Sequence, residues 1–197
     1  MKLNHSLILC LLLFFTLSLP KCNAQESIRI GLKGGFNLAN IRGYSTSPNN
    51  SPQAGFTGGA YVNIGLKNKM GITAELLYSQ KGTITKDSPA YYYVRINYID
   101  IPVFFTYELY KGLTAQIGLN MAIPVYANVR QGTTETNFLP TLTFSLPMGM
   151  VYEFDNGINF GWRADFGLST IATNSNDGGK NYVFSLCAGY TFFKKEK

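Results

Sequence analysis

Apolar and polar residues alternate along most of this chain, and the alternation recurs in segments of similar length. In residues 158–168, for example, Ile158, Phe160 and Trp162 alternate with polar or small residues. Successive side chains of a β-strand point to opposite faces, so a period of two predicts a strand with one apolar and one polar face. Eight segments have this pattern: residues 27–40, 55–66, 70–81, 92–107, 113–126, 140–153, 158–168 and 181–193.

The connections between these segments differ in length in a regular way. Those after the second, fourth and sixth segments are short, and residues 155–157 have the hairpin sequence Asp-Asn-Gly. The other four connections are long and polar: residues 41–54, 82–91, 127–139 and 169–180. An even-stranded transmembrane barrel with both termini in the periplasm has short periplasmic turns and long external loops. The alternation of long and short connections therefore predicts an all-β fold, an eight-stranded antiparallel up-and-down transmembrane β-barrel.

The fourth segment is the least regular of the eight. Ile99, Val103 and Tyr107 keep one phase in its second half, but the first half loses the alternation. Proline has no backbone N–H to give to a sheet, and within strands it occurs at edges or bulges. Pro102 therefore predicts a bulge or kink nearby.

Eight antiparallel strands also form soluble, lipocalin-like barrels, which turn their apolar face inward around a ligand. Residue size argues against that arrangement here. Gly, Ala, Ser, Thr and Asn dominate the polar face, whereas the other face carries Leu, Ile, Phe, Met and Trp, which are too bulky for so small a lumen. Only 14% of the residues are charged, too few for a hydrated outer coat. We therefore expect the bulky face to contact lipid.

Aromatic residues recur near both ends of the predicted strands. Such side chains gather at the two interfaces of a membrane, where they form girdles around a transmembrane barrel. The girdle at the periplasmic end is predicted to include Tyr107, Tyr152, Trp162, Tyr190 and Phe192. A second girdle, near the external rim, is predicted to include Phe36, Phe56, Tyr78, Tyr126, Phe138 and Tyr182.

Residues 1–24 do not share the alternation. A lysine near the start is followed by an apolar run at residues 6–19 and a short polar stretch ending in Ala24. This is the order of a secretory signal peptide, and the run is shorter than the roughly 20 residues of a membrane-spanning helix. We expect cleavage after Ala24, which leaves a barrel domain of residues 25–197. An exported barrel of this kind is expected in the outer membrane of a Gram-negative cell.

Export limits the chemistry of the mature chain. His5, the single histidine, leaves with the signal peptide, and Cys187 is then left without a partner for an internal disulfide. Lipidation of Cys22 is the alternative to cleavage after Ala24, but Lys21 occupies the position where a small residue should precede it. Without histidine as a general base we expect no enzyme, and without a His or Cys cluster we expect no metal and no other cofactor.

Several short motifs are spread along the mature chain. They are GLKGGFN at residues 31–37, ELLYSQKG at residues 75–82 and YIDIP at residues 98–102, together with the aromatic final strand. In combination they resemble the PorT-like outer-membrane β-barrel family of Bacteroides-type bacteria. The resemblance implies an outer-membrane barrel; most members are uncharacterised, and the namesake is linked to a protein-secretion and gliding apparatus. Because the matching motifs are structural, that role is not carried over to particular residues.

Five charged residues lie on the predicted inward face at similar heights: Lys33, Glu75, Asp100, Arg163 and Asp165. Buried charges persist where they are paired, and an eight-stranded barrel leaves little room for water, so we expect salt bridges that plug the lumen. The alternative is an ion or proton path, which would make the protein a narrow channel for small solutes. Asp100, Asp165 and Glu153 would also suit a catalytic carboxylate pair, but we expect them to pair with Arg163 and Lys33.

Two surfaces are candidates for partner binding. Tyr91, Tyr92 and Tyr93 lie at the second external loop, where they either recognise a partner or extend the external girdle. The periplasmic turns and tail are basic, and they either reach lipid headgroups or dock an acidic protein. This rim contains Lys67, Lys69, Lys111, Lys194, Lys195 and Lys197 against Glu108, Asp155 and Glu196. The sequence thus predicts a structural or envelope-interaction role, with outer-membrane lipids and envelope proteins as partners and no nucleic acid.

Overall fold

The computed structural model describes residues 25–42, 50–87, 90–132, 134–137, 140–171 and 179–196. The predicted signal peptide at residues 1–24 and Phe138 of the predicted external girdle lie outside the described residues. No helix in the described part of the chain has the length and apolar character needed to cross a membrane. The elements described are all β-strands.

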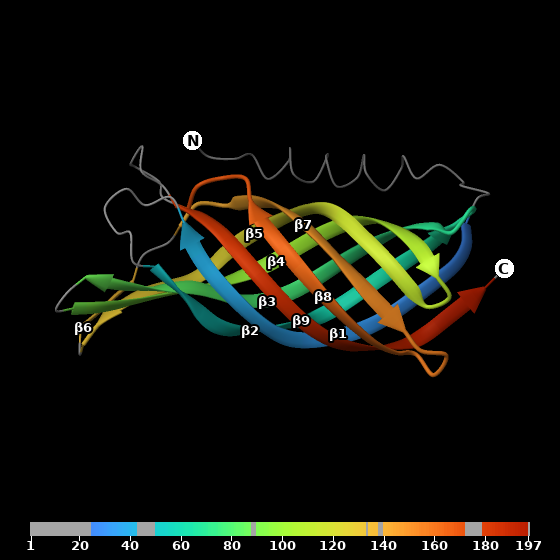
Figure 1. Cartoon of the computed structure of the whole chain (residues 1–197), viewed down its shortest axis with the longest axis horizontal. Coiled ribbons are helices and arrows are strands. Elements are labelled where there is room, and N and C mark those ends of the chain that lie inside the picture. The colour runs from blue at the N-terminus through green and yellow to red at the C-terminus, as the bar shows by residue number, and fades with distance from the viewer. Residues whose placement is uncertain are drawn as a thin grey trace, which may run out of the picture.

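Eight long strands form a closed antiparallel ring, and a short ninth strand is added to it (Figure 1). The ring order is β4-β3-β2-β1-β9-β8-β7-β5, and pairing of β4 with β5 closes it. The short strand β6 pairs with β5 alone. The predicted eight-stranded up-and-down barrel is therefore confirmed. The strands are β1 (Gln25–Arg42), β2 (Asn50–Leu66), β3 (Met70–Asp87), β4 (Ala90–Tyr110), β5 (Leu113–Gln131), β6 (Thr134–Asn137), β7 (Thr143–Glu153), β8 (Ile158–Gly167) and β9 (Lys180–Glu196).

The bulky apolar residues face outward, as the sequence predicts. Phe36 is 77% exposed and Leu119 62% exposed, whereas the alternating positions Asn37 and Asn120 are buried in the lumen. The inward face is lined by small residues because the neighbouring strands leave no space for larger ones. At Gly118, for example, an added Cβ would collide with the carbonyl oxygen of Val103 on β4. This orientation matches a barrel surrounded by hydrocarbon.

The first three external connections are shorter than predicted, because the strands continue into regions that the sequence indicates as loops. β3 extends to Asp87 and β4 begins at Ala90, so most of residues 82–91 is strand. β5 extends to Gln131, and β6 lies within the predicted third loop. Beyond the apolar band the outward face no longer contacts lipid, so the pattern of bulky apolar residues on that face ends while the backbone pairing continues. In Figure 1 these extensions lie at the end of the barrel opposite the C-terminus.

The interpretation of β4 as out of phase is wrong. Arg95 and Asn97 continue the outward face, and Ile96 and Tyr98 are fully buried on the inward face. What changes along β4 is therefore the polarity of each face, because this part of the strand has left the apolar band. The inward face becomes apolar and the outward face polar.

Beside Pro102 itself, the pairing of β4 with β3 has no register shift. The ladder skips a short stretch beside Pro102, but Ala74 pairs with Val103 and Leu77 with Asp100 in unchanged register. A register shift does lie nearby, on the other side of β4. It falls between Asn97 and Tyr98, where they pair with β5, and it agrees with the irregularity predicted near Pro102.

Candidate functional site

The middle of the lumen contains a buried triad of charges formed by Lys33 on β1, Glu75 on β3 and Arg163 on β8. Lys33 Nζ donates a hydrogen bond to Glu75 Oε1 at 2.8 Å. Arg163 Nη2 donates to both carboxylate oxygens of Glu75, at 2.9 and 3.0 Å. The Glu75 side chain is 1% exposed, and the Arg163 guanidinium lies 4.3 Å from the centroid of the Phe104 ring. One carboxylate thus satisfies two buried cations.

Asp100 and Asp165 do not join this triad, which corrects the prediction that they pair with Lys33 and Arg163. Asp100 forms a buried ion pair with Lys81 at 2.9 Å. Asn120 donates to Asp100 at 3.3 Å and to Asp165 at 3.5 Å. Asp165 Oδ1 has no hydrogen-bond partner among the described residues. The five predicted lumen residues therefore form two clusters, and Asp165 is the least tightly held of them.

Lys81 was missed as a lumen residue although the sequence contains a signal for it. Lys81 has the same phase as Glu75 on β3, so it belongs to the inward face. It is the last residue of the predicted strand at residues 70–81, where the alternation weakens. Its ammonium group also lies 5.0 Å from the centroid of the Tyr98 ring.

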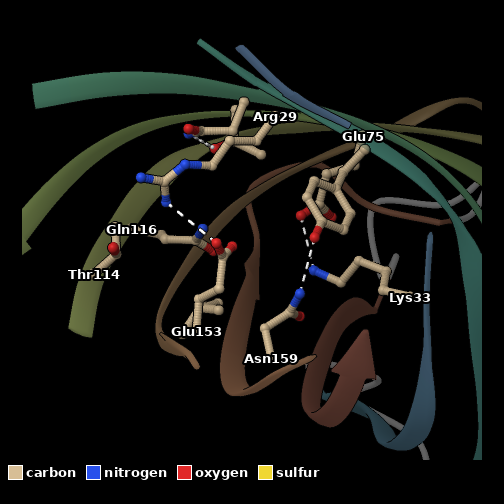
Figure 2. Close-up of a pocket in the computed structure, with 11 residues that line it drawn as sticks. Arg29, Lys33, Glu75, Thr114, Gln116, Glu153 and Asn159 are labelled. Carbon is tan, nitrogen blue, oxygen red and sulfur yellow. Dashed lines mark hydrogen bonds and ion pairs between the residues drawn. The ribbon is translucent and has the colours of Figure 1, made fainter. Parts of the chain in front are cut away.

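A third cluster lies toward the periplasmic end, around a cavity of about 60 Å³ (Figure 2). Arg29 pairs with Glu153 at 3.5 Å, so Glu153 also does not pair with Lys33 or Arg163. The Thr191 hydroxyl donates to Glu153 at 3.0 Å, and the Tyr61 and Thr191 hydroxyl oxygens are 2.8 Å apart. Figure 2 shows the cavity between the Arg29–Glu153 pair and Lys33.

The external end of the lumen is apolar instead of charged. Buried side chains from β1, β4, β5, β9 and the β8–β9 connection meet there, and Val94 packs against them. Asn181 on β9 donates a hydrogen bond to the Tyr98 hydroxyl at 3.2 Å. The apolar residues of this group are Ile41, Ile96, Tyr98, Ala122, Ala127 and Ile171. From the periplasmic to the external end, the lumen thus has a polar cluster around a small cavity, a charged middle and an apolar closure. In the sequence, the sign of this apolar closure is the loss of alternation in the first half of the segment that forms β4.

The charges of the three clusters balance. Arg29, Lys33, Lys81 and Arg163 provide four positive charges, and Glu75, Asp100, Glu153 and Asp165 provide four negative charges. A neutral, internally paired set of this kind stabilises ionised groups that burial alone would destabilise. Within the described part of the chain, no three His, Cys, Asp or Glu residues are arranged to hold a metal ion.

The predicted surface residues lie on the outside of the barrel. All five members of the periplasmic girdle have exposed side chains: Tyr107, Tyr152, Trp162, Tyr190 and Phe192. The Tyr91–Tyr93 run is divided between two faces of the β3–β4 extension. Tyr91 and Tyr93 are exposed on the outer face, whereas the Tyr92 hydroxyl accepts a hydrogen bond from Gln131 at 3.0 Å.

Comparison with known proteins gives a family and a fold. A family model described as "outer membrane protein beta-barrel domain" matches residues 23–173. Ail, the attachment invasion locus protein of Yersinia pestis, solved with the heparin analogue sucrose octasulfate, is similar with a TM-score of 0.54 at 10% identity, over 85% of this chain and 99% of Ail. Neisserial surface protein A is similar with a TM-score of 0.56 at 11% identity, over 83% of this chain and 97% of that protein. No curated protein sequence matches the chain.

Proposed function

The chain belongs to the outer membrane protein β-barrel domain family, and on that premise we propose that it is a closed barrel whose external sheet binds other components of the envelope. The family places the chain in the outer membrane, and the two structural neighbours share its barrel fold. In this proposal the barrel combines a plugged lumen with a rigid binding surface outside the membrane.

The observation that carries the proposal is the continuation of the sheet beyond the apolar band. Residues 81–87 of β3 and 90–96 of β4 extend the hairpin by about 20 Å along the strands, at roughly 3.3 Å per residue. β5 and β6 lengthen the neighbouring hairpin, and every residue of β6 is exposed. A protein that needed only a membrane anchor would gain nothing from ordering this much backbone outside the membrane.

The extension offers two features that suit a protein partner. Tyr91 and Tyr93 present exposed rings on one face, and tyrosine is frequent among the residues that dominate binding energy. β6 pairs with β5 on one side, and no strand of the described residues pairs with its other edge, which can therefore pair with a strand of another protein. An ordered sheet also loses less conformational entropy on binding than a flexible loop.

We expect replacement of Tyr91 and Tyr93 by serine to remove most partner capture. The proposal is tested by crosslinking in the native envelope, followed by identification of the captured proteins. Loss of two central aromatic contacts, at about 2 kcal/mol each, would weaken binding by several hundredfold. The matched control is Tyr110→Ser, an exposed tyrosine at the periplasmic end. Equal capture by all three proteins would contradict a role for the external sheet.

The plugged lumen distinguishes this proposal from a narrow channel. Three features oppose solute passage: the Lys33–Glu75–Arg163 triad, the Lys81–Asp100 pair and the apolar closure. We expect the purified protein in planar bilayers to give no discrete openings, whereas a porin added to the same bilayer does. Openings that disappear in Arg163→Ala would favour the channel instead.

The proposed role is non-enzymatic. The carboxylates that would suit a catalytic pair each have another partner: Asp100 contacts Lys81, Asp165 contacts Asn120 and Glu153 contacts Arg29 and Thr191. The PorT-like resemblance remains a prediction, as does docking of a partner to the basic periplasmic rim. If the resemblance holds, proteins of a secretion apparatus are the first partners to look for.

A further inference from the structure

Two cations meet at the external rim of the barrel, at the ends of β1 and β9. Arg42 and Lys180 are directly opposite each other in the antiparallel register. Their neighbours Ile41 and Asn181 also pair with each other and are buried in the lumen, so Arg42 and Lys180 belong to the outward face. Arg42 is exposed and Lys180 partly so.

This arrangement is unfavourable without a counter-charge, because like charges directly opposite on a sheet repel each other. Neither side chain forms an ion pair with a carboxylate of the described residues. The contact that orients Arg42 is with an aromatic ring: its guanidinium carbon lies 5.6 Å from the centroid of Tyr182. Tyr182 in turn packs edge-on against Phe166, with ring centroids 6.3 Å apart. The cation is thus held over an aromatic base with its polar edge open to the outside.

The surface beside this cation pair is the apolar band. Leu38 precedes Arg42 on the outward face of β1, and Phe184 follows Lys180 and Tyr182 on the outward face of β9. Leu38, Phe184 and Phe166 are all exposed. A ligand bound here would therefore have an anionic group at the cations and an apolar portion along these side chains. A soluble anion would use only the first of these features, whereas a lipid uses both.

We propose that Arg42, Lys180 and Tyr182 form a binding site for the phosphate group of a phosphorylated glycolipid in the outer leaflet, with its acyl chains along Leu38 and Phe184. The glycolipid phosphate neutralises the two facing cations at the level where the apolar band ends. Basic residues at a membrane rim commonly recognise anionic headgroups in this manner. The site is on the opposite side of the membrane from the basic periplasmic rim, and it does not depend on the external sheet.

The test uses the full mature chain folded into phosphatidylcholine vesicles that contain a small fraction of a diphosphorylated glucosamine-disaccharide lipid. This lipid has a photoreactive acyl chain, and crosslinked peptides are identified by mass spectrometry. We expect crosslinks to peptides of β1 and β9, and a loss of about tenfold to thirtyfold in Arg42→Gln/Lys180→Gln, from the removal of two surface cations. Both residues lie on the outer surface, and unchanged migration of unboiled protein on gels checks that the variant is folded.

Two controls separate this site from general attraction to charge. Lys67→Gln/Lys69→Gln removes the same charge from a periplasmic turn and should leave the β1 and β9 crosslinks unchanged. A lipid with the same sugars and chains but no phosphate should give the low level of the double variant. Crosslinks that persist in Arg42→Gln/Lys180→Gln would overturn the proposal. Crosslinks abolished by millimolar inorganic phosphate would also overturn it, because the site would then bind free phosphate without using the lipid chains.

Discussion

Replacing Glu75 by glutamine is expected to lower the free energy of unfolding by about 3–5 kcal/mol, the usual cost of removing one partner of a buried ion pair. Glu75 is the shared acceptor of Lys33 and Arg163, at 2.8 and 2.9 Å. The neutral amide leaves two buried cations facing each other without a counter-charge. The measurement is urea-induced unfolding of the protein in lipid vesicles, followed by tryptophan fluorescence of Trp162.

The matched control is Glu153→Gln, at a pair that is longer and partly exposed. Arg29 and Glu153 are 3.5 Å apart, with side chains 30% and 18% exposed. Pairs accessible to water contribute about 1 kcal/mol or less, so this variant should lose much less stability. Combining Glu75→Gln with Lys33→Met should recover part of the loss, since it removes one of the unpaired cations. A loss below about 1 kcal/mol in Glu75→Gln would mean that water reaches the triad freely.

The membrane-spanning part of the fold could be predicted from the sequence because it has two chemically opposite surroundings. Each strand that crosses the bilayer has lipid on one side and a narrow lumen on the other, so residues such as Phe160 and Asn159 alternate strictly. Outside the bilayer water replaces lipid on the outward side of the strands. Arg95 faces water and Ile96 faces an apolar core, which reverses the pattern and resembles a loss of phase. The short strand β6, exposed at every residue, has no pattern at all.

The members of the lumen clusters were easier to predict than their pairing. The phase of each strand places Lys33, Glu75 and Arg163 inside, since an inward face is a property of one strand. Which of them meet depends on the stagger between strands that are not neighbours, such as β3 and β8, and this follows from the closed geometry of the barrel. For the same reason the sequence gives no sign that Asp100 pairs with Lys81 instead of Arg163.

Leu119→Arg tests the orientation on which the site depends. Leu119 lies on the outward face of β5, paired with Val103 in the middle of the apolar band, and its side chain is 62% exposed. For a protein in water, replacing an exposed leucine by arginine changes stability by about 0.5 kcal/mol or less. At the midplane of a bilayer the same change costs about 2–4 kcal/mol, because the guanidinium is moved into hydrocarbon. We expect the larger loss in vesicle-based urea unfolding.

The control for this prediction is Thr136→Arg on β6, which adds the same charge to an exposed strand position outside the apolar band. It should leave the free energy of unfolding within about 0.5 kcal/mol of the unsubstituted protein. The difference between the two variants measures the surroundings of Leu119, since the added side chain is identical. If both variants were equally stable, the bulky face would not contact hydrocarbon. The small and charged face would then not be the lumen, and the pairing of Glu75 with two buried cations would lose its physical reason.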